Sequence, residues 1–284
     1  MADNDSAASL IEEFHLTFLH VLTTALKPDL YVLKGGANLR YFFGSFRYSQ
    51  DIDLDYLSDQ PWRLEEVVDR VLASPILGMS LRASGISLVN PTKPKQTDTT
   101  RRWKMGLTST QTASDVTVRT KIEFSIRHGI SQYEFATLPD SVIERYGLRS
   151  FSVQRYGLVA MIEQKIAALA NRSQTKARDV FDLDLLFRLR AKSRNEEVIS
   201  SAYAQEASLR ALELSDENFE SEVVPFLEPE IARLYQAPDT WKRMRMFVCD
   251  NMQALLAASD KVSALGYDAE GSALHRSNDK WDVK

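Results

Sequence analysis

Residues 31–55 read YVLKGGANLRYFFGSFRYSQDIDLD. A short apolar run ends at Gly35 and Gly36, a helical segment follows, and acidic residues then alternate with apolar ones. This alternation predicts a β-strand that carries three carboxylates on one face, Asp51, Asp53 and Asp55. Because neighbouring carboxylates repel each other, a hard divalent cation such as Mg²⁺ is expected between them. A glycine turn binds phosphate through backbone N–H groups, so the stretch predicts phosphoryl-transfer chemistry.

The aspartates could instead form the solvated face of an edge strand. Aspartate is among the poorest strand formers, however, and three on one face repel each other, so a functional site is favoured. Nearby, Ser49 offers a hydroxyl that could donate to a phosphate, and Arg47 offers a positive charge. Ordinary turn chemistry explains either of these two residues equally well.

A further acidic position follows in the middle of the chain. Residues 116–127 alternate as a strand, with Glu123 on the polar face beside Lys121. A cross-strand ion pair would explain Glu123 without any catalytic role. Alternatively, Glu123 completes a metal site with Asp51 and Asp53, or it accepts the proton of an attacking hydroxyl. The residues alone favour neither explanation.

Lys165 lies in the middle of an apolar helical stripe. A lysine that points into a core needs an anionic partner, because its burial without one is costly. That partner could be a bound triphosphate or a carboxylate of the next helix, which carries both Asp179 and Asp182. The helix dipole alone would also favour an aspartate at position 179. An internal ion pair and a role in ligand binding are compatible.

The periodicity of the chain predicts an α/β half followed by a helical half. Helices are expected over residues 9–27 and 62–73, and strands over 30–33, 51–57 and 79–89. A Pro/Lys/Thr-rich loop is expected over 91–100, followed by a hairpin of 101–108 and 116–127 around a polar turn at 109–114. Further helices are expected over 158–171, 176–190, 196–213 and 239–258. We therefore expect two lobes, residues 1–150 and 151–284.

Composition narrows the class of protein. The 284 residues are 44% hydrophobic and 26% charged, as in ordinary globular proteins. A net charge of −4 predicts that any contact with nucleic acid depends on local basic patches. Arg101-Arg102-Trp103-Lys104 is a candidate, although short basic runs are commonly just solvated. The single Cys249 excludes an intrachain disulfide, and without a signal peptide or membrane span in the sequence a cytoplasmic location is expected.

Several blocks together resemble the polymerase-β-like nucleotidyltransferases, and within them the AbiEii family of toxins from type IV toxin–antitoxin and abortive-infection systems. The blocks are Lys34–Leu39, Arg47–Leu54, Lys121–Ser125, Glu163–Leu169 and Arg178–Leu183. The resemblance implies an α/β fold with a mixed sheet, flanking helices and a helical C-terminal lobe. It implies that this lobe contributes Lys165 and either Asp179 or Asp182 to the site.

The resemblance also assigns roles to the residues above. Catalytic positions are Asp51, Asp53, Glu123, Lys165, Asp179 and Asp182, and the metal ligands for Mg²⁺ are Asp51, Asp53 and Glu123. The NTP is expected to contact Lys34, Gly35, Gly36, Arg47, Ser49 and Lys165. The implied reaction transfers NMP from an NTP to an RNA 3′ end, with tRNA as acceptor, and thereby blocks translation and growth. The implied partner is a separately encoded antitoxin.

Two alternatives to RNA transfer stay open at this point. The same triphosphate chemistry could place NMP on a protein hydroxyl, as in AMPylation. The chain could also be a catalytically silent nucleotide-binding protein, although its complete acidic set argues against this.

Overall fold

The computed structural model describes residues 2–109, 116–127, 132–193 and 197–264. The polar turn expected at 109–114 lies outside the described residues except for its first position. Contacts between Cα atoms divide the chain into two compact units. Unit 1 consists of Met1–Met161 and Glu220–Thr240, and unit 2 of Ile162–Phe219 and Trp241–Lys284.

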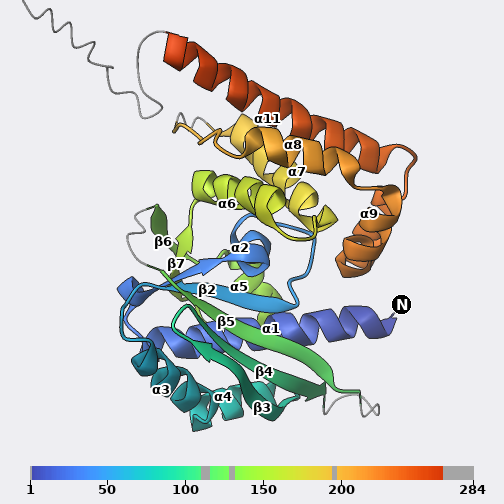
Figure 1. The fold of residues 1–284 in the computed structure, drawn as a ribbon. Coiled ribbons are helices and arrows are strands. Elements are labelled where there is room, and N and C mark those ends of the chain that lie inside the picture. Colours follow the sequence, from blue (N-terminus) through green and yellow to red (C-terminus); the bar gives the residue numbers. More distant parts are fainter. Residues whose placement is uncertain (1, 110–115, 128–131, 194–196, 265–284) are drawn as a thin grey trace, which may run out of the picture. The chain divides into compact units, whose positions relative to one another are not determined.

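Unit 1 is built on a seven-stranded mixed sheet with the order β3-β4-β5-β2-β1-β7-β6 (Figure 1). The pairs β2–β5 and β1–β7 are parallel and the other pairs are antiparallel. The strands are β1 (Tyr31–Lys34), β2 (Asp51–Tyr56), β3 (Ile86–Thr97), β4 (Thr100–Ser109), β5 (Val118–Ile126), β6 (Tyr133–Thr137) and β7 (Ser152–Tyr156). This sheet confirms the predicted α/β class.

One face of the sheet carries the apolar core of unit 1. Ile52 and Leu54 of β2 and Ile122 and Phe124 of β5 are completely buried, as strand alternation requires. They join one core cluster with the buried side chains of α1, α3 and α4. Since alternate residues point the other way, the predicted acids of β2 and β5 face away from these helices.

The helices of unit 1 are α1 (Ala2–Ala25), α2 (Gly35–Phe42), α3 (Pro61–Leu72), α4 (Pro75–Ala83), α5 (Asp140–Tyr146) and α10 (Pro229–Tyr235), with 3₁₀ turns η1 (Pro28–Leu30) and η2 (Val224–Phe226). The last segment returns from far along the chain. The Tyr48 N–H donates to the Phe226 carbonyl at 2.8 Å, and the Glu228 N–H donates to the Phe46 carbonyl at 3.2 Å. Residues 226–228 thus fix the loop after α2.

The expected strand at 79–89 is wrong over most of its length, because helix α4 occupies Pro75–Ala83. Ser74 caps this helix by accepting from the Leu77 N–H at 3.1 Å, and proline at the first helical position favours the same start. The expected loop at 91–100 is also wrong, because β3 continues to Thr97. An edge strand tolerates proline, and irregular register after Val89 and after Thr92 accommodates Pro91 and Pro94.

Unit 2 is helical, as the C-terminal periodicity predicts, but the helix expected over 196–213 begins only at Ala204. Its helices are α6 (Leu158–Asn171), which begins in unit 1, α7 (Ala177–Lys192), α8 (Ala204–Glu213), α9 (Asp216–Glu222) and α11 (Thr240–Ala264). The Phe219 and Trp241 rings stack with centroids 4.9 Å apart, which joins α9 to α11. In the described part of the chain, no helix has the length and apolar character needed to cross a membrane.

Candidate active site

Two rows of polar residues cross the sheet of unit 1 on the face opposite the apolar core. In the Asp53 row, Asp53 of β2 lies in register with Glu123 of β5, and Glu123 with Arg102 of β4. In the neighbouring Asp51 row, Asp51 lies in register with Lys121. Residues two apart on a strand are separated by about 6.6 Å. The three predicted acids therefore lie together on one face of two adjacent parallel strands.

The glycine turn meets this group of acids. Gly35 has a φ of +68°, and a Cβ placed on it would lie 3.1 Å from Oδ2 of Asp53. A Cβ on Gly36 would lie 2.7 Å from the Ser49 hydroxyl and 3.3 Å from Nη2 of Arg47. Helix α2 begins at Gly35 without a side-chain cap, and helix N-termini of this kind attract anions. The turn therefore brings Asp53, Ser49 and Arg47 to one place.

Cationic side chains already separate the carboxylates. Nζ of Lys121 lies 3.3 Å from Oδ2 of Asp51 and 3.6 Å from Oε2 of Glu123. Nε of Arg102 donates to Oε2 of Glu123 at 2.5 Å. Burial alone would raise the pKa of Glu123, but the hydrogen bond from Arg102 and the charge of Lys121 outweigh it and lower the pKa. Glu123 is therefore ionised at neutral pH.

Asp53 differs from its neighbours in having no polar partner. Its carboxylate is half-buried, and no side chain among the described residues forms a hydrogen bond or ion pair with it. Mg²⁺ is usually held by one or two carboxylates together with substrate phosphates, and Asp51 and Asp53 match that ligand set. No three His, Cys, Asp or Glu side chains of the described residues are grouped to hold a metal by themselves. The two carboxylates of Asp51 and Asp53 fit a cation that is shared with a phosphate ligand.

Lys34 and Asp55 form a buried cluster at the end of the same face. Nζ of Lys34 donates to Oδ1 of Asp55 and, at 2.9 Å, to the Ser125 hydroxyl. The Tyr156 hydroxyl donates to Oδ2 of Asp55 at 2.6 Å. Burial, together with the hydrogen bond to Asp55 and its charge, raises the pKa of Tyr156. Lys34 and Asp55 together thus join β1, β2, β5 and β7. Nothing in the sequence pattern pointed to Tyr156.

Arg40 is a second residue that the sequence did not single out. It is buried in α2, where Nε donates to Glu12 at 2.7 Å and Nη2 donates to Glu228 at 2.7 Å. Its Nη1 donates to the Ser45 carbonyl at 2.8 Å. Arg40 therefore holds α2 and the loop of residues 45–49 in place, and these two segments carry the glycine turn, Arg47 and Ser49. A buried arginine between two distant glutamates leaves no local signal in a sequence.

Lys165, Asp179 and Asp182 belong to unit 2, where they form an internal cluster. Nζ of Lys165 lies 2.9 Å from Oδ1 of Asp179 and 2.5 Å from Oδ2 of Asp182. Both aspartates are completely buried, and Nε of Arg172 lies 2.9 Å from Oδ2 of Asp179. The carboxylate partners expected for Lys165 are therefore present. The expected contact between Lys165 and a nucleotide stays a prediction.

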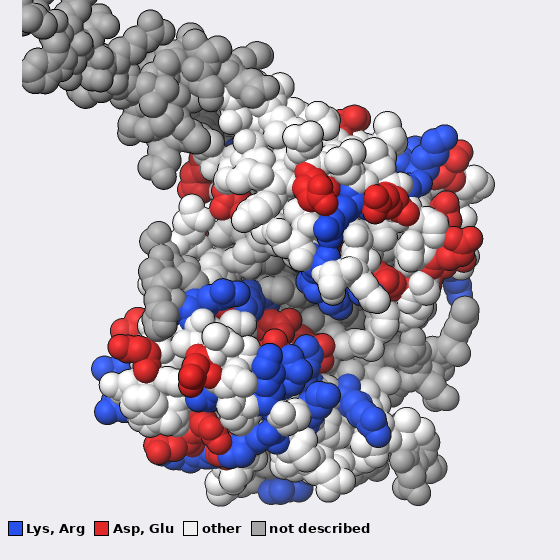
Figure 2. Space-filling view, in the orientation of Figure 1, with Lys and Arg blue, Asp and Glu red and all other residues white. Residues whose placement is uncertain are grey.

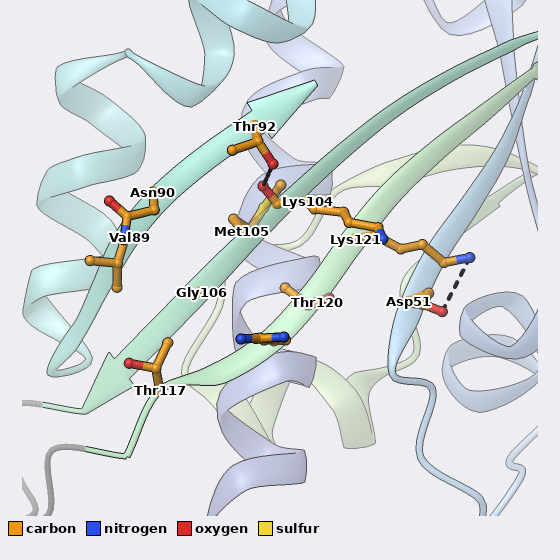
Figure 3. A pocket seen from close by; sticks show the side chains of 11 residues that line it. Asp51, Val89, Asn90, Thr92, Lys104, Met105, Gly106, Thr117, Thr120 and Lys121 are labelled. Carbon is orange, nitrogen blue, oxygen red and sulfur yellow. Dashed lines mark hydrogen bonds and ion pairs between the residues drawn. The ribbon is translucent and has the colours of Figure 1, made fainter. Parts of the chain in front are cut away.

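A cavity of about 600 Å³ opens beside Asp51 in unit 1 (Figure 3). Its lining comes from β3, β4 and β5, and it includes the basic residues Lys104, Arg119 and Lys121. Figure 3 shows the side chains of Lys104 and Lys121 extending toward Asp51 along the strand face. The cavity is thus continuous with the acidic site.

Two solved structures share the fold of this chain. The crystal structure of JHP933 from Helicobacter pylori has a TM-score of 0.54 and 20% identity, with 91% of this chain and 97% of that chain covered. A candidate nucleotidyltransferase from H. pylori has a TM-score of 0.53 and 20% identity, with 87% and 97% covered. The fold is therefore that of nucleotidyltransferase structures.

The family follows from the sequence. Residues 17–248 match the family described as "Nucleotidyl transferase AbiEii toxin, Type IV TA system". The chain therefore belongs to the AbiEii nucleotidyltransferase toxins. A search of curated proteins gives no significant match.

Proposed function

We propose that this protein transfers NMP from an NTP to the 3′ hydroxyl of an RNA, with tRNA as the acceptor. One observation carries the proposal. The half-buried carboxylate of Asp53 has no partner among the described residues and lies against the Gly35 turn, in register with Glu123. A carboxylate without a protein partner beside a glycine turn is suited to a metal–triphosphate complex. The same feature argues against a catalytically silent nucleotide-binding protein.

Each residue of the site has a role in this proposal. Asp51 and Asp53 hold Mg²⁺, with Glu123 as the third acid, and the N–H groups of Gly35 and Gly36 bind the triphosphate. Bound Mg²⁺ supplies charge for the triphosphate and lowers the pKa of the attacking hydroxyl. Ser49 and Arg47 add a hydroxyl and a positive charge at the turn, in agreement with their positions around Gly36. Lys34 contributes charge from the end of β1.

The reaction exchanges a phosphoanhydride bond of the NTP for a phosphodiester bond. The acceptor oxygen forms a bond to the α-phosphorus, the bond between that phosphorus and the bridging oxygen breaks, and pyrophosphate leaves. Glu123 accepts the proton of the attacking hydroxyl, a role supported by its position in register with Asp53 on the adjacent strand. Arg102 and Lys121 keep it ionised.

We propose that helices α6 and α7 also contribute to the site. In this proposal Lys165 contacts the triphosphate while Asp179 and Asp182 hold its amine. Modified tRNA 3′ ends no longer accept amino acids, so growth stops. The family implies an antitoxin as partner, and we propose that it is encoded separately.

The test follows label from the α-phosphate of each of the four NTPs, supplied separately with total tRNA and cell lysate. We expect the label in tRNA, released by a 3′ exonuclease. Label found only in protein bands would show that the acceptor is a protein hydroxyl and not RNA. A tRNA with an oxidised 3′ ribose is the matched control, because it lacks the attacking hydroxyl.

A further inference from the structure

The surface under the cavity beside Asp51 is formed by rows of residues that lie in register across β3, β4 and β5. The Asp51 row continues across the sheet from Lys121 to Lys104 of β4 and Thr92 of β3. The next row begins at Arg119 and continues to Gly106. Gly106 has to be small, because a Cβ there would lie 2.5 Å from Cγ2 of Thr117. The cavity is therefore a recess over two rows that lead directly away from the acids.

The basic residues of this recess are not neutralised by their neighbours. Lys104 and Arg119 are exposed, and neither side chain has an acidic partner among the described residues. Asp51 is the only acid among the lining residues, and Lys121 is its partner. Figure 2 shows Lys and Arg side chains gathered over β4 and β5 next to the acidic group. The recess therefore attracts an anionic ligand even though the whole chain has a net charge of −4.

Two residues of the basic run Arg101–Lys104 face away from this recess. Trp103 is buried in the core and its Nε1 donates to Asp69 at 2.8 Å, so its ring offers no stacking surface. Arg101 is buried on the same side as Trp103. Only Arg102 and Lys104 reach the site face. The residues that line the recess include no aromatic ring, so it offers no surface for base stacking.

We propose that this recess binds the sugar–phosphate backbone of the acceptor strand, which rests on the proposed transfer to RNA. Lys104 and Arg119 contact successive phosphates, and Thr92 and Thr117 offer hydroxyls to the same groups. Lys104 of β4 and Arg119 of β5 lie on adjacent strands and in neighbouring rows, so one strand of RNA that crosses the recess can reach both. An extended strand along these rows would place its 3′ end at Asp51. Backbone contacts of this kind are independent of base sequence.

The test measures binding without chemistry. A fluorescent single-stranded RNA oligonucleotide is titrated with the protein in the absence of NTP, for the wild type and the double variant Lys104→Gln/Arg119→Gln. We expect RNA affinity to fall about tenfold and the slope of log K against log salt to decrease by about 0.7 per lost contact. NTP affinity, measured by calorimetry, should not change, because neither residue touches the glycine turn.

The matched control is Arg63→Gln/Arg70→Gln, which removes two exposed charges from α3. This variant should bind RNA like the wild type, because α3 packs against α1 on the core side of the sheet. Equal loss in both double variants, or none in the Lys104/Arg119 variant, would contradict the proposal. Binding of an acidic peptide by a protein that does not bind RNA would also contradict the proposal. Cross-links from thiouridine RNA to the wild-type protein should map to β4 and β5.

The two proposals fail in different ways. If the Lys104/Arg119 variant transfers NMP to RNA and binds RNA with unchanged affinity, the recess is not the RNA-binding surface, but the proposed activity stands. If RNA binds in the recess and no transfer occurs, the proposed activity is wrong, but the recess is an RNA-binding surface.

Discussion

At the scale of single residues, strand β2 shows how neighbours of one type take different roles. Asp51 and Asp53 lie on the same face as Asp55, and the sequence predicted that alternation correctly. The family resemblance already sets Asp55 apart, and the structure supplies the reason, because Lys34 and Tyr156 pair with Asp55 and not with Asp51 or Asp53. Those partners come from other strands, and their approach depends on register, which one segment of sequence cannot specify. The roles of Asp51 and Asp53 as metal ligands stay predictions.

Gly35 is expected to matter both for the backbone conformation of the turn and for nucleotide binding. In Gly35→Ala, the positive φ costs about 1–2 kcal/mol of unfolding free energy. The new Cβ also presses on Asp53, so we expect Mg²⁺-dependent NTP binding to weaken about tenfold, or ~1.4 kcal/mol. Calorimetric titration measures the second effect.

Gly44 is the matched control for Gly35. Its φ is +69°, and a Cβ there would meet nothing within 4 Å. Gly44→Ala should therefore lose similar stability and keep NTP affinity. Equal NTP affinity in both variants would show that Asp53 does not depend on the turn.

Lys165 is expected to be essential for stability. Lys165→Met leaves Asp179 and Asp182 buried without their cation, and loss of one partner of a buried ion pair costs about 3–5 kcal/mol. Urea unfolding measures this loss, with the exposed Lys192→Met as control at about 0.5 kcal/mol or less. An unchanged midpoint in Lys165→Met would contradict the internal cluster and leave ligand binding as the reason for the lysine.

At the scale of elements, periodicity predicted the helices and strands that carry the proposed site more accurately than it predicted α4 and the edge strand β3. The segments around β1, β2 and α6 were located within a few residues. The failures at α4 and β3 have one cause. Short apolar runs fit helix and strand alike, and the prolines of β3 suggested a loop although an edge strand accepts them. Edge position is a tertiary property, so local sequence does not show it.

The contact of α1 with β5 predicts a pH dependence. His15 is buried, and its Nε2 lies 2.7 Å from the Thr120 hydroxyl. That hydroxyl donates to the Gln50 carbonyl at 2.8 Å, so Nε2 is the donor to Thr120. Burial lowers the pKa of His15 from 6.5 to about 3. Between these values the unfolded state binds the proton and the folded state does not.

Stability should therefore be complete above the unfolded pKa of His15 and should fall as the pH falls toward its folded pKa. The contribution is at most about 1.4 kcal/mol per pH unit. Urea unfolding at about pH 7 and about pH 5 measures it, with His15→Gln as the non-titrating control. The wild type should lose more stability on acidification than the variant. Parallel losses would mean that His15 accepts a proton in the folded protein.

At the scale of the whole molecule, family and fold agree. The family match covers residues 17–248, and both solved structures share the fold at 20% identity. The sequence motifs were sufficient for the family, because they are blocks in a fixed order. The overall charge was uninformative, because strand alternation places Arg102, Lys104, Arg119 and Lys121 on one face of β4 and β5. The basic recess therefore became visible only with the register of the sheet.

The most direct test of the account is transfer of labelled NMP to tRNA by Asp53→Asn. Asp53 has no partner among the described residues, so the variant should unfold within about 0.5 kcal/mol of the wild type. Asp55→Asn, two residues along the strand, should instead lose about 1–3 kcal/mol, because it leaves buried partners unsatisfied. We predict that Asp53→Asn keeps its thermal unfolding curve and transfers no label. Transfer at the wild-type rate by a folded Asp53→Asn would contradict the proposed site.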